Sequence, residues 1–152
     1  MNNSTFVYAT YIRTSPEKLW KALTSSEFTK QYWFGKELQS DWEEGSAVTF
    51  LDKNKEITDQ GIVIKSNPYH LLSYTLKCVQ DATEYQVMPK VTFELKQMGS
   101  IVKLTLKHEY LSEGAFKDEG EGFIGINNGW PAIMSNLKSL LETERILPEI
   151  VL

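Results

Sequence analysis

Apolar and polar side chains alternate with a period of two along much of the chain, which is typical of strands with one buried face. The clearest example is the segment in which Val91, Phe93 and Leu95 alternate with polar neighbours. Glycine, asparagine and aspartate residues between the alternating segments favour tight turns. The segments predicted as strands are 5–14, 37–42, 46–52, 60–66, 71–79, 88–97 and 101–110.

Two short helices are predicted between the first and second strands. Ser15 followed by Pro16 predicts the start of the first, because serine caps helix N-termini and proline is tolerated in the first turn. A second short helix is expected to begin at Ser25 or Ser26 and to end near Gly35.

A longer amphipathic helix is predicted over 129–143, near the C-terminus. Its apolar residues are spaced three and four apart, and they are Trp130, Ile133, Met134, Leu137, Leu140 and Leu141. About 14 helical residues span roughly 21 Å, which is enough to cross a curved sheet. The preceding segment, 111–127, contains four glycines and a group of acidic residues, so we expect a long loop that acts as a mobile lid.

These elements predict one α+β domain over residues 1–152. The apolar face of an antiparallel sheet needs a cover, and 129–143 is the amphipathic segment long enough to provide it. We therefore expect a helix-grip fold, in which a curved antiparallel sheet of about seven strands wraps around a long C-terminal helix.

A strongly curved sheet and a straight helix do not pack evenly along their whole length, so we expect a cavity between them. Aromatic walls with a few polar groups are typical of small-molecule pockets. The candidate lining residues are Tyr8, Trp33, Phe50, Tyr74, Phe93, Leu106, His108, Tyr110, Trp130, Met134 and Leu137. The alternative is a fully packed core built from the same residues, and residues such as Trp130, Met134 and Leu137 are more often plain core than cavity wall.

His108 is the most informative polar residue, because it points with the apolar side of its predicted strand. It could be a core histidine bonded to a neighbour, a polar anchor for a ligand carbonyl or hydroxyl group, or a general acid or base. Tyr110, on the same face, could supply a second hydrogen bond. The sequence shows no carboxylate partner for His108, so no catalytic residue is assigned.

Composition narrows the classes of function. The chain is 41% hydrophobic and 24% charged, with a net charge of −4, which argues against a nucleic-acid-binding surface. Its single cysteine, Cys78, excludes an internal disulfide and suits a reducing compartment. The N-terminus lacks a signal-peptide pattern, and no apolar run approaches the ~20 residues that span a bilayer. We expect a cytoplasmic protein without membrane insertion.

Known cofactor and metal motifs are absent or misplaced. Residues 120–125 match G-x-G-x-x-G, but they lie in an acidic loop and not between a parallel strand and a helix, so nucleotide binding is not expected. His70, His108 and Cys78 lack the spacing of metal ligands. No nucleophile motif is present. We expect no cofactor and no metal.

Four short sequence motifs, which follow one another across nearly the whole chain, resemble the motifs of one family. They are SPEKLWKALT at 15–24 with QYWFG at 31–35, GIV at 61–63 with Asn67-Pro68 and Leu71, LTLKHE at 104–109, and NGW at 128–130 with Leu137 and Leu141. They resemble the SRPBCC (START-like) superfamily and, within it, the activator of heat-shock chaperone ATPase homologue (AHSA1-type) branch. Tyr32 stands where that branch often has a tryptophan.

The resemblance implies a helix-grip fold with a hydrophobic cavity under the C-terminal helix. It does not imply one function, since the superfamily includes lipid and sterol carriers, polyketide aromatases and cyclases, hormone receptors and a domain that assists a chaperone ATPase. The leading hypothesis is therefore a binder of a small hydrophobic molecule that is lipid-like, sterol-like or aromatic. A cyclase or isomerase enzyme and a chaperone-stimulating module are the alternatives, and a homodimer stays open.

Overall fold

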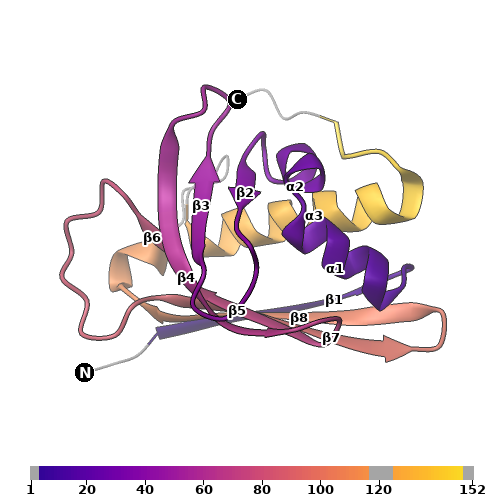
Figure 1. The fold of residues 1–152 in the computed structure, drawn as a ribbon. Helices are drawn as coiled ribbons and strands as arrows, with labels where there is room; N and C mark the ends of the chain where they lie inside the picture. The colour runs from indigo at the N-terminus through magenta and orange to yellow at the C-terminus, as the bar shows by residue number, and fades with distance from the viewer. Residues whose placement is uncertain (1–3, 117–124, 149–152) are drawn as a thin grey trace.

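The computed structural model describes residues 4–116 and 125–148, and within them an antiparallel sheet surrounds a long helix (Figure 1). The strands are β1 (Ser4–Ile12), β2 (Glu37–Gln39), β3 (Ala47–Leu51), β4 (Ile57–Asn67), β5 (Leu71–Thr75), β6 (Lys77–Cys78), β7 (Lys90–Met98) and β8 (Ile101–Leu111). The helices are α1 (Pro16–Thr24), α2 (Ser26–Tyr32) and α3 (Ile126–Thr143), with a 3-10 helix, η1, over Glu113–Phe116. The predicted helix-grip fold is confirmed.

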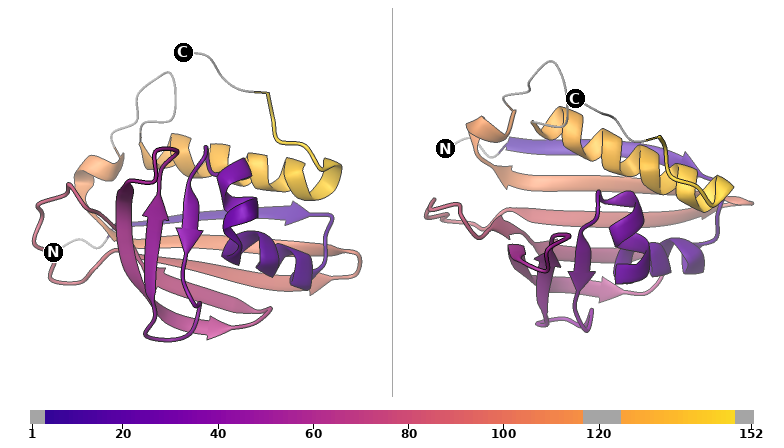
Figure 2. Two further views of the ribbon diagram at one scale, coloured as in Figure 1. Left: turned by 45° about the horizontal axis from the view of Figure 1, so that its top comes forward. Right: turned by 90° about the horizontal axis from the view of Figure 1, so that it is seen from above.

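The strands of the sheet follow the order β1-β8-β7-β5-β4-β3-β2, and all pairs are antiparallel. The short strand β6 is outside this order and pairs with β4. Figures 1 and 2 show that β1, β8 and β7 run beneath α3, while β3 and β2 stand beside it. The helices α1 and α2 lie on the same side of the sheet as α3. The bend in the sheet therefore places side chains from β3, β4 and β8 around one end of α3.

The two short helices form as the sequence predicts. Ser15 is the N-cap of α1, and its hydroxyl accepts a hydrogen bond from the Lys18 N–H at 3.2 Å, with Pro16 in the first turn. The Tyr32 hydroxyl, at the end of α2, is buried and donates to the Ala22 carbonyl at 2.9 Å. This bond fixes the second short helix against the first.

The sheet bends where β4 passes from one partner to another. The predicted strand 71–79 is divided into β5 and β6, and β4 pairs with each of them over a different part of its length. At the crossing, a Cβ atom on Gly61 would lie 1.7 Å from the Thr75 carbonyl oxygen. Glycine is therefore required at this position so that the two backbones can approach each other.

The C-terminal helix begins earlier than the sequence indicates, at Ile126 instead of residue 129, and it ends at Thr143 as predicted. Pro131 therefore lies inside the helix instead of opening it. The partly buried Ile126 packs against the core, and this contact stabilises the helical conformation of the residues between Ile126 and Pro131. Part of the predicted loop is also ordered, since η1 forms there. Residues 117–124, which carry most of the expected glycine lid, lie outside the described ranges.

The core lies between α3 and the concave face of the sheet. On β8, Val102, Leu104, Leu106 and His108 are buried in strict alternation, which confirms the predicted period of two. From α3 the buried residues are Trp130, Ile133, Met134, Asn136, Leu137 and Leu140. Burying each large aliphatic side chain among them contributes roughly 1.5–3 kcal/mol, so the packing of α3 against the sheet is a main source of the stability of the domain.

Candidate functional site

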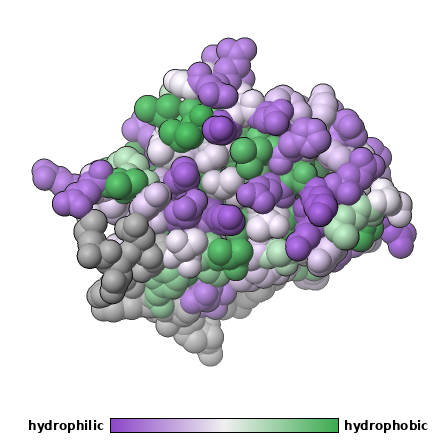
Figure 3. Space-filling model, turned by 90° about the horizontal axis from the view of Figure 1, so that it is seen from below, coloured by the Kyte–Doolittle hydropathy of each residue, from purple (hydrophilic) through white to green (hydrophobic). Residues whose placement is uncertain are grey.

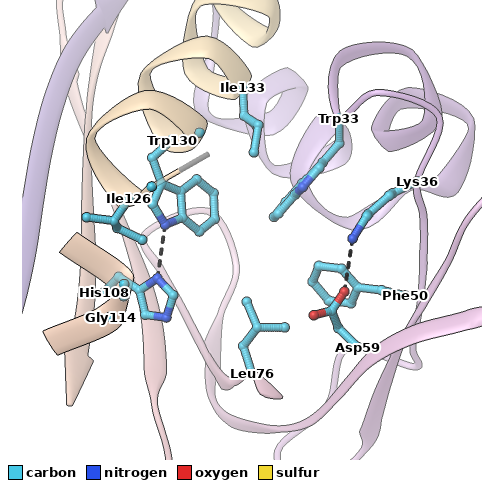
Figure 4. Close-up of a pocket in the computed structure, with 13 residues that line it drawn as sticks. Trp33, Lys36, Phe50, Asp59, Leu76, His108, Gly114, Ile126, Trp130 and Ile133 are labelled. Carbon is cyan, nitrogen blue, oxygen red and sulfur yellow. Dashed lines mark hydrogen bonds and ion pairs between the residues drawn. The ribbon is translucent and has the colours of Figure 1, made fainter. Parts of the chain in front are cut away.

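A cavity of about 490 Å³ lies beside the first turns of α3 (Figure 4). Its walls come from the segment after α2, from β3, β4 and β8, from η1 and from α3. Among the described residues, those that line it are Trp33, Lys36, Phe50, Asp59, Leu76, His108, Gly114, Ala115, Gly125, Ile126, Gly129, Trp130 and Ile133. The volume lies within the range of about 300–1,000 Å³ that is usual for small-molecule sites.

Three aromatic rings form much of the wall. The ring of Trp33 meets Phe50 edge to face with centroids 5.3 Å apart, and it meets Trp130 in the same way at 5.2 Å. All three residues are at least nine-tenths buried. Such edge-to-face contacts fix the ring planes, so the cavity has flat apolar walls that are already in place.

His108 and Trp130 form the polar contact on one side of the cavity. The indole Nε1 of Trp130 donates to Nδ1 of His108 at 3.0 Å, and both side chains are buried. Burial lowers the pKa of His108 from 6.5 to about 4, so the imidazole is neutral near neutral pH. This contact joins the second turn of α3 to the inward face of β8.

An ion pair borders the other side of the cavity. The ammonium group of Lys36 lies 3.0 Å from Oδ2 of Asp59, and the two side chains are 33% and 17% exposed. The Thr58 hydroxyl also donates to Asp59 Oδ2, at 2.8 Å. Figure 4 shows this pair across the cavity from His108. The Asp59 carboxylate is thus held by two donors, and the pair adds no net charge to the wall.

Four of the residues proposed from the sequence line this cavity, namely Trp33, Phe50, His108 and Trp130. The other seven do not line it. Five of these are buried in the core around it, and they are Tyr74, Phe93, Leu106, Met134 and Leu137. The hydroxyl of Tyr74 is buried there without a hydrogen-bond partner among the described residues.

Tyr8 and Tyr110 are half-buried, and neither lines the cavity. Tyr110 has a φ of 62°, which lies in the left-handed region, so β8 departs from regular strand geometry one residue before its end. The register with β1 also shifts between Ser4 and Phe6, opposite this part of β8. This irregularity explains why the expected pairing of Tyr110 with His108 on one face of the cavity is not formed.

Lys36, Asp59, Leu76 and Ile133 were not among the candidates. Asp59 falls just before the predicted strand 60–66, but β4 begins at Ile57 and places Asp59 directly opposite Phe50. Cross-strand partners point to the same face of a sheet. Because Phe50 was expected to point inward, the register between the two strands would have shown that Asp59 does too.

Two further hollows lie elsewhere. One, of about 590 Å³, borders the opposite side of α3 and includes Phe34, Ala132 and Leu147. The other, of about 520 Å³, is lined by β3, β4 and β6 and by Met88. Neither is lined by a histidine or a tryptophan among the described residues, so the cavity beside His108 is the stronger candidate.

Within the described ranges, no group of three His, Cys, Asp or Glu residues could hold a metal ion. Cys78 is exposed. Among the described helices, none has both the length and the apolar composition needed to cross a membrane.

The fold is similar to several solved structures. The Aha1 dimer from Colwellia psychrerythraea matches with a TM-score of 0.70 and 20% identity over 92% of this chain and 97% of that one. An HSP90 activator from Plasmodium falciparum matches with a TM-score of 0.70 and 19% identity over 90% and 95% of the two chains. A protein from Cytophaga hutchinsonii matches with a TM-score of 0.70 and 24% identity over 95% and 98%.

No curated protein sequence matches the chain. The family described as activator of Hsp90 ATPase homolog 1-like protein matches residues 13–142, which cover α1, α2, strands β2 to β8 and nearly all of α3. The match includes every residue that lines the cavity. The chain therefore belongs to the activator of Hsp90 ATPase homolog 1-like family.

Proposed function

We propose that the domain binds a small, largely apolar molecule in the cavity beside the first turns of α3. The observation that carries this proposal is a space of about 490 Å³ whose walls include the rings of Trp33, Phe50 and Trp130. Aromatic walls with a few polar groups are typical of small-molecule pockets. A hollow that opens to solvent and has such walls therefore favours a binding role over a purely structural one.

Catalysis has less support from the same geometry. Trp130 already occupies the lone pair on Nδ1 of His108, and burial lowers the pKa of the imidazole to about 4, so His108 is a weak base. The Asp59 carboxylate already accepts hydrogen bonds from Lys36 and Thr58, at 3.0 and 2.8 Å. These contacts favour a binder over a cyclase or isomerase.

A fluorescent naphthalene dye, displaced by added lipids or aromatic compounds, tests the proposal. Ile133 points into the cavity, so Ile133→Trp should fill part of it and weaken dye binding by about tenfold or more (Figure 4). Ala132→Trp is the matched control, because it adds the same ring to α3 on the side of the other hollow. If both variants bind the dye as the wild type does, the dye is not in this cavity and the proposal fails.

A second candidate function is the stimulation of a chaperone ATPase. It is favoured by the family description and by the similarity to a protein described as an HSP90 activator. The ATPase rate of a purified Hsp90 chaperone, measured with and without the domain, tests this role. Ile133→Trp separates the two functions, because filling part of the cavity should weaken ligand binding and leave an interaction through the outer surface unchanged.

A further inference from the structure

The contact between His108 and Trp130 fixes the position of the imidazole proton. An indole nitrogen can donate a hydrogen bond but cannot accept one, so the 3.0 Å contact requires Nδ1 of His108 to be the acceptor. In a neutral imidazole the proton must then be on Nε2. The lowered pKa of His108, caused by burial, keeps the ring in this neutral form at neutral pH.

The protonated nitrogen faces the cavity. In Figure 4, Nε2 is on the edge of the ring away from Trp130, toward the space that Leu76 borders. Among the described residues, Nε2 has no acceptor, since the contact with Trp130 is the hydrogen bond of this side chain. His108 is 8% exposed and lines the cavity, and Nε2 is not among the fully buried polar atoms that lack a partner, so an acceptor in the cavity can reach it. The cavity therefore presents one unused donor in a fixed direction.

The charges on the opposite wall disfavour a charged ligand. Lys36 and Asp59 neutralise each other at 3.0 Å. An anion or a cation entering the cavity would therefore meet no unpaired counter-charge on this wall. Moving an unpaired charge into such a site is expensive, whereas a neutral molecule meets no such penalty.

The aromatic walls add a preference for shape. Trp33 lies edge to face with both Phe50 and Trp130, with interplanar angles of 88° and 65°. Flat rings in fixed planes favour flat, unsaturated ligands, because these can make stacked or edge-to-face contacts that a flexible alkyl chain cannot.

We infer that this cavity takes an uncharged, flat, unsaturated molecule with a carbonyl-type oxygen that accepts a hydrogen bond from Nε2 of His108. Trp130 is the positioning residue, because its indole N–H keeps the proton on Nε2. This inference rests on the proposed function and specifies the chemical class of the ligand.

The test compares three probes of similar shape, which are acetylnaphthalene, isopropenylnaphthalene and naphthoate, all substituted at the same ring position. The first carries a ketone acceptor, the second replaces that oxygen by carbon, and the third is an anion. We expect the ketone to bind about fivefold more tightly than the alkene, because it gains one hydrogen bond to His108. Naphthoate should bind more weakly than either, because its charge must be buried. Binding is measured by the change in intrinsic tryptophan fluorescence.

Three variants test the position of the donor. His108→Phe keeps a ring but removes the N–H, so the ratio of ketone to alkene affinity should fall to about one while the alkene still binds. Ile133→Val changes the apolar wall and leaves the donor in place, so it should keep the wild-type ratio. Trp130→Phe should reduce the ratio and allow the proton to occupy Nδ1, which ¹⁵N chemical shifts of the imidazole would report directly.

The outcomes are distinct. If the wild type binds the alkene and the ketone equally, or if His108→Phe keeps the preference for the ketone, the inference is overturned and the proposed binding function stands. If the wild type binds none of the three probes, both fail. Should His108→Phe not fold, the ¹⁵N shifts of wild-type His108 decide, because a proton found on Nδ1 contradicts the inference.

Discussion

The indole Nε1 of Trp130 and the imidazole Nδ1 of His108 are 3.0 Å apart, and this hydrogen bond joins the long helix to the sheet that surrounds it. The two rings meet edge to face with an interplanar angle of 78°. The contact therefore has two consequences, since it anchors α3 on β8 and it sets which ring nitrogen of His108 carries the proton beside the cavity. The first consequence is visible in stability and the second in ligand binding.

The stability of the domain should depend on pH through His108. Burial lowers its pKa in the folded protein to about 4 from 6.5, so an unfolded chain takes up the proton first as the pH falls. The free energy of unfolding is therefore unaffected by His108 above about pH 6.5, decreases between about pH 6.5 and about pH 4, and loses no more below that range. At about 1.4 kcal/mol per pKa unit, the total loss is up to about 3 kcal/mol.

Denaturant unfolding at several pH values in this window measures the effect, with His108→Gln as the comparison. The variant lacks the titrating ring, so its stability should fall less steeply as the pH decreases, while all other groups titrate alike in both proteins. Parallel stability curves for the two proteins would show that His108 is not held in its neutral form by burial.

Gly61→Ala should severely destabilise the domain. The added Cβ would lie 1.7 Å from the backbone oxygen of Thr75, and a backbone atom cannot move away as the end of a flexible side chain can. We expect a loss of at least about 3 kcal/mol in the free energy of unfolding. Gly114→Ala is the control, because the nearest atom to its Cβ is 4.0 Å away. Equal stability of the two variants in denaturant titrations would disprove the close approach of β4 to the end of β5.

Asn136→Ala should loosen the contacts that join α3 to the end of α2 and to the segment after Thr143. The Asn136 side chain is buried, its amide donates to the Tyr32 carbonyl at 3.4 Å, and its oxygen accepts from the Leu147 N–H at 3.1 Å. Removing these bonds should cost about 1–2 kcal/mol and increase proteolysis after Thr143. Ser139→Ala, which removes a bond to the Arg145 carbonyl at 2.7 Å on the exposed side of α3, should cost less. A larger effect at Ser139 would contradict this account.

Much of the fold could be predicted from local patterns. The alternation around Val102, Leu104 and Leu106 identified β8 and its buried face, and Ser15 with Pro16 marked the start of α1 within one residue. The beginning of α3 could not be located, because the pair of asparagines and the glycine before Trp130 are poor helix formers, and it is the tertiary packing of Ile126 that extends the helix through them.

The candidate site was only partly predictable. Trp33, Phe50, His108 and Trp130 could be proposed because each is apolar or aromatic at an inward position. Lys36 and Asp59 could not, because charged residues are normally assigned to the surface, and their approach to within 3.0 Å depends on how β4 bends beside the segment after α2. The direction of the His108 donor also depends on Trp130, which is 22 residues away in the sequence.

The most direct test of the central claim, that a ligand occupies the cavity beside α3, uses the indole N–H signals of the four tryptophans in an NMR titration with acetylnaphthalene. Trp33 and Trp130 line the cavity, whereas Trp20 packs against Tyr69 and Trp42 against Tyr74 outside it. We predict that the signals of Trp33 and Trp130 shift in a saturable manner while that of Trp20 stays in place. Saturable shifts at Trp20 with none at Trp33 and Trp130, or no shift at any of the four, would contradict the account.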